Sequence, residues 1–336
     1  MSNLSSENSA GFAADAADTQ VPHAERAHEK YEQLIARTKD IPPIPTAVVW
    51  PCEGHALAGP VDAAKEGIID AVLIGPEARI RKVAEEAGLD LDGLSIVDVE
   101  TEEAAAAQAV SMAHDGKVAA LMKGSLHTDV LMHEVVAGKP NLRTGRRISH
   151  VFGMDVPNYE DVLFITDAAI NIFPDVETKR DIVQNAIDLF WGLRGEAPRV
   201  AILSAVEVVN PKIPGTTDAA ILCKMADRGQ ITGGILDGPL AMDNAINPEA
   251  AKIKGIDSPV AGRAQILVVP DLEAGNMLAK NLIFLAGADA AGIVVGAAVP
   301  IILTSRADSV RTRLASTAVG ALFAHHLVQE KQRQAT

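Results

Sequence analysis

Two adjoining segments decide the fold class, Asp70-Ala-Val-Leu-Ile-Gly-Pro76 and the stretch from Glu77 to Gly88. The first is a short apolar run ended by a Gly-Pro turn, which is typical of a buried strand. The second is a helical pattern closed by glycine, the residue that favours a helix C-cap. A buried strand followed directly by a helix is the repeating unit of a parallel sheet, so the pair predicts an α/β fold.

The same alternation continues on both sides of this unit. It predicts strands over residues 46–50, 94–98, 118–124, 198–204, 233–237, 264–270, 290–295 and 299–303, with helices over 23–39, 56–67, 102–115, 176–193, 217–228, 274–286 and 309–327. One interruption differs, because the apolar runs 151–154 and 162–167 flank a short turn at 158–161. That spacing predicts a hairpin, so we expect a mixed sheet. Residues 1–22 show no period and predict a disordered lead.

Composition restricts the classes of partner and ligand that we expect for this chain. The chain has 336 residues, a net charge of −14 and only 3% aromatic residues, which disfavours a nucleic-acid partner. There is no apolar run of membrane-spanning length and no secretory signal pattern at the start, so no membrane partner is expected. Cys52 and Cys223 cannot make a disulfide framework, which favours a reducing cytoplasm. The histidines are scattered, and no spacing predicts a metal site.

The strand end with the most candidate binding residues is Pro270-Asp-Leu-Glu-Ala-Gly-Asn276, which joins an apolar strand to a helix. Ligands of open α/β sheets bind beyond such strand ends, where helix N-termini direct amides at anions. Asp271, Gly275 and Asn276 are therefore candidate binding residues, and Gly275 would allow close approach. The alternative is an ordinary loop in which Asp271 caps the helix.

Two more strand ends carry candidate residues. Asp237 and Asp243, in Asp237-Gly-Pro-Leu-Ala-Met-Asp243, could accept protons or hydrogen bonds, although an Asp-Gly-Pro turn explains the same pattern. In Thr304-Ser-Arg-Ala-Asp308, Arg306 could bind phosphate and Ser305 could donate to an oxyanion. Asp308 could also be only a helix cap.

A further strand end, Lys123-Gly-Ser-Leu-His-Thr128, could line the same cleft through Lys123, Gly124 and Ser125, or it could be a serine-capped helix start. The basic cluster Arg143, Arg146 and Arg147 could receive the phosphates of a nucleotide-like cofactor, or it could be a solvated loop. Neither a Gly-x-Gly-x-x-Gly nor a Gly-Lys-Ser/Thr phosphate loop occurs, which argues against a dinucleotide enzyme or a kinase.

Taken together, these segments resemble the phosphate acetyltransferase/phosphate butyryltransferase family from about Tyr31 to Leu327. The matching motifs, which recur in order, are Leu121-Met-Lys-Gly-Ser125, Asp167-Ala-Ala-Ile-Asn171 with Pro174, Ala201-Ile-Leu-Ser204, Asp237-Gly-Pro-Leu240, Ser258-Pro-Val-Ala-Gly262, Pro270-Asp-Leu-Glu-Ala-Gly-Asn276 and Ser305-Arg306. The likeness is closest to the transferase half of bifunctional enoyl-CoA hydratase/phosphate acetyltransferase proteins, without the hydratase half.

The resemblance implies two α/β domains with a cleft between them, of the isocitrate/isopropylmalate dehydrogenase-like type. The first domain would combine residues 23–150 with 296–336, and the second would be inserted as residues 151–295. The family is usually dimeric, so a homodimer is implied. It uses coenzyme A and acetyl-CoA as substrates, with no tightly bound cofactor and no metal.

The implied reaction is attack of the coenzyme A thiolate on an acyl phosphate within a ternary complex. Ser305 would stabilise the oxyanion, and Arg306 would bind the phosphoryl group or the cofactor. The acetyltransferase branch has an acidic residue seven positions after this serine as a proposed base; Thr312 stands there, so Asp308 is the candidate in its place. An arginine of that branch is also missing from residues 130–134, which leaves its task to Arg143, Arg146 or Arg147.

Three alternatives stay open. The same reaction could act on butyryl or another short acyl group, because one or two methylenes alter pocket fit by only about 1–3 kcal/mol. A non-catalytic protein that binds coenzyme A or acyl phosphate would explain the missing acid at Thr312. A decarboxylating dehydrogenase would share the fold, but the sequence shows no acidic metal cluster opposite a basic clamp.

Overall fold

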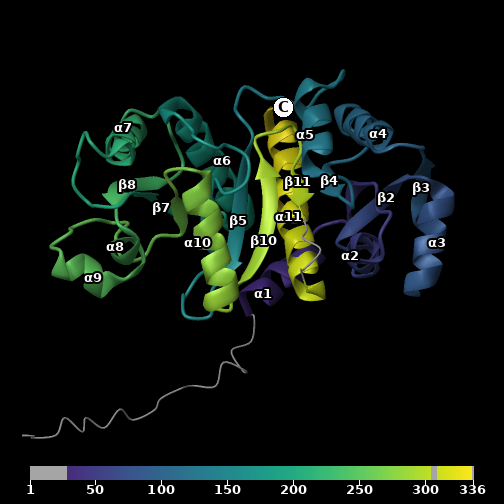
Figure 1. Ribbon diagram of the computed structural model, residues 1–336, viewed down its shortest axis with the longest axis horizontal. Helices are drawn as coiled ribbons and strands as arrows, with labels where there is room; N and C mark the ends of the chain where they lie inside the picture. The colour runs from purple at the N-terminus through teal and green to yellow at the C-terminus, as the bar shows by residue number, and fades with distance from the viewer. Residues whose placement is uncertain (1–28, 304–308, 335–336) are drawn as a thin grey trace, which may run out of the picture.

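The computed structural model describes residues 29–303 and 309–334, which fold around one sheet (Figure 1). The strand order is β3-β2-β1-β4-β11-β10-β5-β6-β9-β7-β8. The predicted lead at 1–22 and the candidate residues Ser305, Arg306 and Asp308 lie outside the described residues. The strands are β1 (Ile44–Val49), β2 (Ile69–Gly75), β3 (Ser95–Asp98), β4 (Ala120–Lys123), β5 (Ser149–Asp155), β6 (Leu163–Thr166), β7 (Arg199–Leu203), β8 (Ile235–Leu240), β9 (Ile266–Val268), β10 (Asp289–Val295) and β11 (Ile301–Leu303).

The sheet is mixed, as the sequence predicts. The strands β3, β2, β1, β4 and β11 are mutually parallel, and so are β6, β9, β7 and β8. Between the two groups, β10 pairs antiparallel with both β11 and β5, and β5 pairs antiparallel with β6. The predicted hairpin is therefore β5–β6, and the two parallel groups run in opposite directions.

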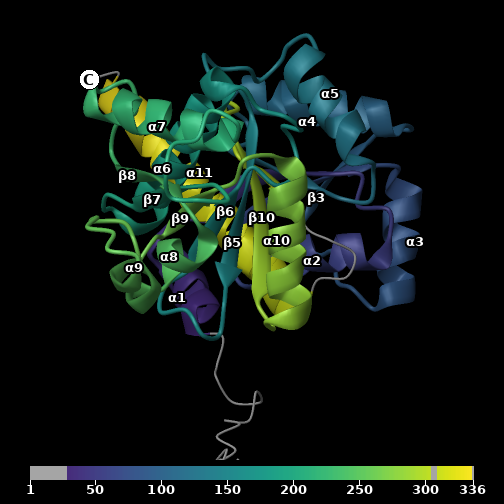
Figure 2. The same ribbon diagram turned by 60° about the vertical axis from the view of Figure 1, so that its left-hand side comes forward.

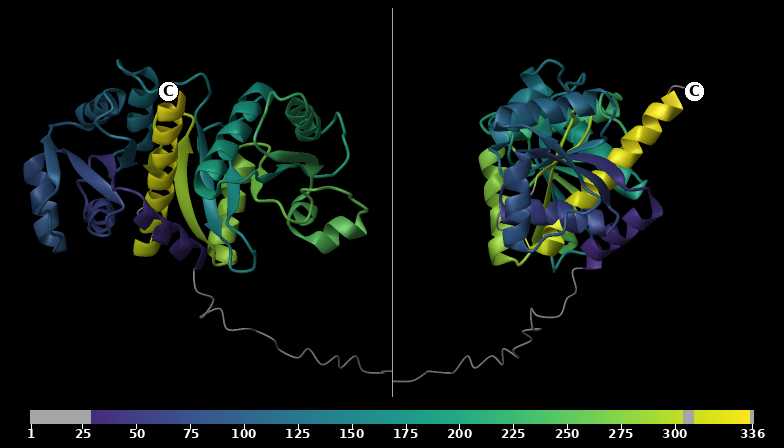
Figure 3. Two further views of the ribbon diagram at one scale, coloured as in Figure 1. Left: turned by 180° about the vertical axis from the view of Figure 1, so that it is seen from behind. Right: turned by 90° about the vertical axis from the view of Figure 1, so that its right-hand side faces the viewer.

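Helices cover both faces of the sheet. Figure 1 shows α10 in front of the central strands, and Figure 3 shows α6 and α11 on the opposite face. The helices are α1 (Glu29–Arg37), α2 (Gly54–Lys65), α3 (Glu77–Ala87), α4 (Glu102–His114), α5 (Thr128–Ala137), α6 (Val176–Arg194), α7 (Pro214–Asp227), α8 (Met242–Ile246), α9 (Pro248–Ile253), α10 (Leu272–Leu285) and α11 (Val310–Gln334), with a 3-10 turn η1 (Thr38–Asp40).

Local sequence explains where the helices begin and end. The side chains of Thr101, Asp175 and Asp271 accept hydrogen bonds from backbone amides in the first turns of α4, α6 and α10. The helix that first predicted the fold, α3, ends at Gly88 in the left-handed conformation with φ 64°. That conformation strains any residue with a Cβ, so the glycine fixes the end of the helix.

Three apolar clusters make the core. One lies around β1, β2, β4 and β11, another packs α6 and α11 against the central strands, and the third lies between those strands and the α8–α10 side. Helix α11 joins the first two, because Ala321 and Ala324 belong to one and Val319 and Phe323 to the other. Tyr31 of α1 is fully buried in the second cluster and donates to the Gly153 carbonyl.

The structure corrects several expectations. Asp237-Gly-Pro239 is not a turn but lies inside β8, next to a register shift in the β7–β8 ladder. The helices α5, α8 and α9 were not predicted, because α5 follows a loop motif and the other two have only six residues or fewer. The closing helix extends to Gln334 instead of residue 327. No helix in the described ranges has the length and apolar character needed to cross a bilayer.

Candidate active site

The arginine cluster lies on the loop from residue 138 to residue 148, between α5 and β5. This loop is attached to the end of β10: Arg143 makes an antiparallel bridge to Ala297, and Thr144 Oγ1 donates to the Gly296 carbonyl at 2.7 Å. Arg146 N in turn donates to Thr144 Oγ1 at 3.1 Å. The three arginines are consequently held beside the end of β10.

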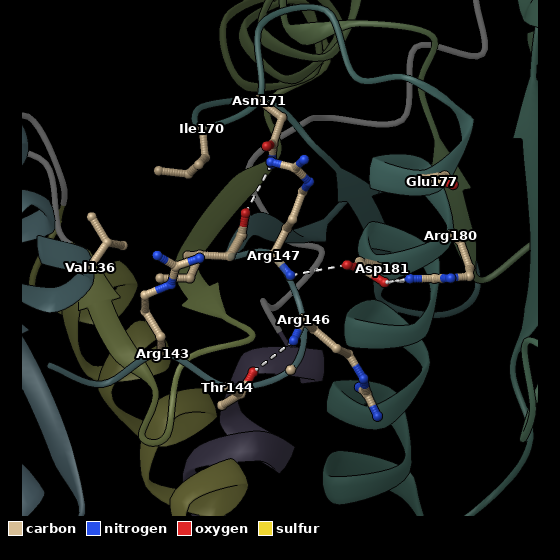
Figure 4. A pocket seen from close by; sticks show the side chains of 12 residues that line it. Val136, Arg143, Thr144, Arg146, Arg147, Ile170, Asn171, Glu177, Arg180 and Asp181 are labelled. Carbon is tan, nitrogen blue, oxygen red and sulfur yellow. Dashed lines mark hydrogen bonds and ion pairs between the residues drawn. The ribbon is translucent and has the colours of Figure 1, made fainter.

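A cavity of about 510 Å³ opens beside this loop (Figure 4). Its walls come from α5, the arginine loop, the loop after β6 and the first turns of α6. The lining residues are Val136, Arg143, Thr144, Gly145, Arg146, Arg147, Ile148, Ile170, Asn171, Glu177, Arg180 and Asp181. The volume lies within the range of small-molecule sites.

The four arginines of this cavity differ in their partners. Arg146 forms an ion pair with Asp188, and Arg180 forms one with Asp181 at 2.8 Å. Within the described residues, the guanidinium groups of Arg143 and Arg147 have no ion pair. Figure 4 shows these two side chains extending toward Ile170 and Asn171, whereas Arg146 extends away. Two guanidiniums without an ion pair among the described residues, in one cavity of a protein with net charge −14, make this cavity a candidate anion site.

Asp167 holds the loop whose residues Ile170 and Asn171 line the opposite wall. Asp167 is 2% exposed, and its carboxylate accepts from the backbone amides of Ala169, Ile170 and Asn171 at 2.9, 3.1 and 3.2 Å. The Asn171 amide group donates to Asp167 Oδ2 at 2.6 Å and to the Ile148 carbonyl at 2.9 Å. One buried carboxylate thus folds the loop that brings Asn171 to the arginines.

The N-terminus of α10 supports the same loop from its other side. Leu272 N donates to the Ile172 carbonyl at 3.1 Å, and Asn276 Nδ2 donates to the Ala168 carbonyl at 3.4 Å. A Cβ on Gly275 would lie 2.7 Å from the Asp167 carbonyl, closer than real contacts allow. Asp271 caps the helix by accepting from Ala274 N at 2.9 Å. Of the residues predicted from sequence, Asp271, Gly275 and Asn276 therefore belong to the helix end that packs on the Asp167 loop. Arg147 lines the cavity on the other side of this loop.

Lys123, Gly124 and Ser125 lie at the end of β4, where their described contacts hold strand ends together. Ser125 Oγ donates to the Trp50 carbonyl at 2.8 Å and accepts from Cys52 N at 3.1 Å, instead of capping α5. A Cβ on Gly124 would lie 2.4 Å from the Val49 carbonyl. Because Ile302 pairs with Met122, the last residue of β11, Leu303, lies beside Lys123.

Asp237 and Asp243 lie elsewhere. Asp237 is on the edge strand β8 and accepts from Gly238 N at 2.8 Å, while Asp243 of α8 pairs with Lys254 at 3.4 Å. Neither lines the arginine cavity. Burial raises the pKa of the nearby Cys223 thiol to about 12, with the Asp237 charge contributing, and burial raises that of Cys52 to about 11. Both free cysteines are therefore poor nucleophiles.

Thr312, where the family resemblance implies an acidic residue, is buried in the first turn of α11. Its Oγ1 lies 3.3 Å from Oδ1 of Asp289 and 3.0 Å from Ser309 Oγ. A carboxylate on β10 therefore already contacts the side chain at this position.

Sequence reasoning missed Asn171, Arg180 and Asp181 as site residues. Asn171 could have been found, because it ends the Asp167-Ala-Ala-Ile-Asn171 motif of the family resemblance. Arg180 and Asp181 lie on a polar helix, where nothing in the sequence separates them from a solvated face. Over residues 29–303 and 309–334, no three His, Cys, Asp or Glu side chains converge in a way that could hold a metal ion.

Comparison with known proteins identifies the class. Residues 103–321 match the family model described as phosphate acetyl/butaryl transferase. A phosphate acetyltransferase of Rhizobium meliloti is 66% identical over 295 residues, which is 88% of this chain and 93% of the relative. The chain belongs to the phosphate acetyl/butaryl transferase family, as the sequence motifs predicted.

Solved structures agree with this assignment. A branched-chain phosphotransacylase from Enterococcus faecalis has a TM-score of 0.74 at 29% identity, covering 84% of this chain and 99% of the other. A 4-hydroxythreonine-4-phosphate dehydrogenase from Klebsiella pneumoniae matches at 13% identity with a TM-score of 0.51, covering 84% and 98%, which shows likeness of fold alone. The α/β architecture is thus the dehydrogenase-like one expected from the resemblance.

Proposed function

We propose that this protein is a phosphate acetyltransferase, which interconverts acetyl-CoA plus phosphate with coenzyme A plus acetyl phosphate. In the direction of acetyl-CoA synthesis the coenzyme A thiol loses its proton to a base, and its sulfur attacks the carbonyl carbon of acetyl phosphate. The new carbon–sulfur bond replaces the carbon–oxygen bond, and phosphate leaves with the electron pair. Both substrates are bound together, so the transfer is direct.

The observation that carries this proposal is that Arg143 and Arg147 share one cavity and that neither guanidinium has an ion pair within residues 29–303 and 309–334. Both substrates carry phosphate groups, and arginine binds such groups through two parallel hydrogen bonds. Asp181 holds Arg147 by accepting from its backbone N at 3.1 Å, while Asn171 supplies a neutral amide on the opposite wall. These contacts support a preorganised phosphate site in this family member.

The remaining assignments extend the proposal to the strand ends. Ser305 stabilises the oxyanion, Arg306 binds the phosphoryl group and Asp308 is the candidate base. Lys123, Gly124 and Ser125 are assigned to the same cleft because β4 and β11 end side by side. Asp271, Gly275 and Asn276 support the Asp167 loop, and we assign Asp237 and Asp243 no role at the arginine cavity.

We further propose that residues 23–150 with 296–336 form one domain, residues 151–295 the other, and that the enzyme is a cytoplasmic homodimer. The opposite directions of the two parallel strand groups support a division near β5 and β10. Tyr31 of α1 is buried among residues of α6 and β6, so in this proposed division α1 also contacts the second domain. Coenzyme A enters as a substrate and not as a tightly bound group.

Phosphate-dependent release of coenzyme A from acetyl-CoA tests the function, assayed beside propionyl-CoA and butyryl-CoA. We expect turnover that requires phosphate and is fastest with acetyl-CoA. A preference for butyryl-CoA would support the second candidate, a phosphate butyryltransferase, which the family description includes. Binding of coenzyme A without turnover of any acyl group would contradict the proposal and leave a non-catalytic binding protein.

A further inference from the structure

A second cavity, of about 430 Å³, lies on the other side of the arginine loop. It is lined by residues of this loop, of α6, of the end of β10 and of α11. Helices α6 and α11 pack against each other, and Figures 2 and 3 show α11, in yellow, beside α6. Thr144, Gly145 and Arg146 line this second cavity and the arginine cavity as well. These three residues therefore separate two spaces, each within the size range of small-molecule sites.

One wall of the second cavity is apolar. Phe323 and Leu327 come from α11, and Val295 and Ala297 come from the end of β10 and the residues after it. Phe323 and Val295 also belong to the core cluster that packs α6 and α11 on the central strands. Because the core holds these side chains in place, the wall is a preformed surface for an aliphatic group.

The charged part of the second cavity is the ion pair between Arg146 and Asp188. Gln184 Nε2 donates to Asp188 Oδ1 at 2.9 Å and so fixes the carboxylate on α6. Within residues 29–303 and 309–334, the guanidinium of Arg146 makes this one hydrogen bond, through Nη1, although a guanidinium has five N–H donors. The two side chains are 42% and 35% exposed. A ligand can therefore reach a cation and an anion that lie side by side.

We propose that the second cavity is an effector site that binds an α-amino acid with an apolar side chain. The carboxylate of the amino acid accepts from Arg146, its ammonium group donates to Asp188, and its side chain packs on Phe323 and Leu327. A zwitterion complements a wall that carries one positive and one negative group. A simple carboxylate would compete with Asp188 for Arg146, and a simple amine would compete with Arg146 for Asp188.

The charge pattern separates this site from the arginine cavity. Arg143 and Arg147 have no ion pair among the described residues, which suits a phosphate group with more than one negative charge. Arg146 is paired instead, so a phosphate in the second cavity would also face the carboxylate of Asp188 and be repelled by it. The second cavity thus selects a ligand without net charge, and it is no second copy of the phosphate site.

Direct contacts couple the second cavity to the arginine cavity. Asn185, which lines the second cavity, donates through Nδ2 to the Arg147 carbonyl at 2.9 Å. A Cβ on Gly296 would lie 2.5 Å from that carbonyl and 2.6 Å from Asn185 Nδ2, so the groups between the cavities are tightly packed. A ligand that joins Arg146 to α11 stabilises the loop with Arg147 extended toward Asn171, and phosphate then binds more tightly. This coupling, unlike the binding of the amino acid, rests on the proposed function.

Isothermal titration calorimetry of the full chain tests the site with three probes. L-leucine carries both charges, isocaproate has the same chain without the ammonium group, and isoamylamine lacks the carboxylate. We expect leucine to bind with a dissociation constant on the order of 0.1 mM, and each analogue to bind at least tenfold more weakly. No binding of leucine up to about 10 mM, or binding of isocaproate as tight as that of leucine, would overturn the proposal.

Variants then locate the binding. Arg146→Gln and Asp188→Asn should each weaken the binding of leucine at least tenfold. Arg180→Gln is the matched control, because Arg180 also pairs with a carboxylate on α6 but lines only the arginine cavity, and it should bind leucine as the wild type does. Unchanged binding by Arg146→Gln, or equal weakening by Arg180→Gln, would place leucine elsewhere and overturn the assignment.

The coupling is measured by repeating the leucine titration in saturating inorganic phosphate. Phosphate should lower the dissociation constant of leucine about threefold, and leucine should lower that of phosphate by the same factor. The same leucine affinity with and without phosphate would contradict the coupling. Turnover is assayed separately: leucine binding to an inactive enzyme would contradict the proposed function alone, and an active enzyme that does not bind leucine would contradict this inference alone.

Discussion

The backbone amide of Arg147 donates to Oδ2 of Asp181 at 3.1 Å, while Oδ1 of the same carboxylate accepts from Arg180 at 2.8 Å. Asp181 is buried on α6, and Arg147 lies on the loop before β5. One carboxylate therefore joins two separate walls of the arginine cavity. Its position is set by a helix and not by a loop, which favours a rigid site.

Removing this carboxylate should loosen the cavity more than it weakens the fold. We expect Asp181→Ala to raise the KM for phosphate about tenfold, equivalent to about 1.4 kcal/mol, with a smaller change in kcat. Steady-state kinetics with phosphate as the varied substrate checks this. Asp188→Ala is the control, because Asp188 pairs with Arg146, whose side chain extends away from the site. Equal effects of the two variants would contradict the role given to Asp181.

Gly275 should tolerate no side chain. A Cβ there would lie 2.7 Å from the Asp167 carbonyl and 3.1 Å from Ala168 Cα, both backbone atoms that cannot move alone. Gly275→Ala should therefore lower the free energy of unfolding by about 1–3 kcal/mol, as overpacking does. Gly54→Ala, in the first turn of α2, meets only an ordinary 3.7 Å contact and should cost little. Denaturant unfolding of both variants makes the comparison.

His150 should make the protein less stable in mild acid. Burial lowers the pKa of this histidine to about 4, against an opposing influence of Asp167, and its Nδ1 has no hydrogen-bond partner. The unfolded chain takes up the proton near its ordinary pKa of about 6.5 while the folded chain does not. Stability is therefore lost as pH falls from about 6.5 toward 4, by an amount on the order of 2–3 kcal/mol.

His150→Gln should remove this part of the pH dependence, since glutamine does not titrate. Thermal unfolding between pH 4 and 8 measures it, with His127→Gln at an exposed position as the control. A wild-type slope in the His150 variant would contradict the prediction.

Thr312 should not accept the acidic residue that the family resemblance implies at this position. Thr312→Asp would set a buried carboxylate against Asp289, whose Oδ1 lies 3.3 Å from Thr312 Oγ1. We expect a loss of about 3 kcal/mol at pH 7, and a smaller loss at pH 5 because protonation relieves the repulsion. Thr312→Val should cost about 1 kcal/mol, the value of a lost hydrogen bond. A stable, more active Thr312→Asp enzyme would show that a base belongs there.

The mixed α/β sheet and most strands could be predicted, because period and glycine or proline boundaries are local properties. The register shift beside Asp237 could not, since it arises from pairing between β7 and β8. Ser125 was ambiguous for a similar reason: its hydroxyl bonds to Trp50 and Cys52, more than seventy residues away. Long-range pairing decides such cases, and local sequence does not encode it.

At the candidate site, sequence reasoning found the arginine cluster but could not tell its members apart. Arg146 and Arg147 are adjacent, yet one is neutralised by Asp188 on α6 and the other has no ion pair in the described residues. That difference depends on how α6 packs beside the loop. The roles of Ser305, Arg306 and Asp308 stay predictions of the family resemblance.

The most direct test of the account compares Arg147→Gln with Arg146→Gln in phosphate-dependent release of coenzyme A from acetyl-CoA. The two variants remove the same charge from neighbouring residues. We expect Arg147→Gln to lower kcat/KM for phosphate about a hundredfold, as loss of about 2–3 kcal/mol of charged hydrogen bonding implies, and Arg146→Gln to stay within about threefold of wild type. Equal activity of the two variants, at any level, would contradict the claim that Arg147 binds phosphate in this cavity.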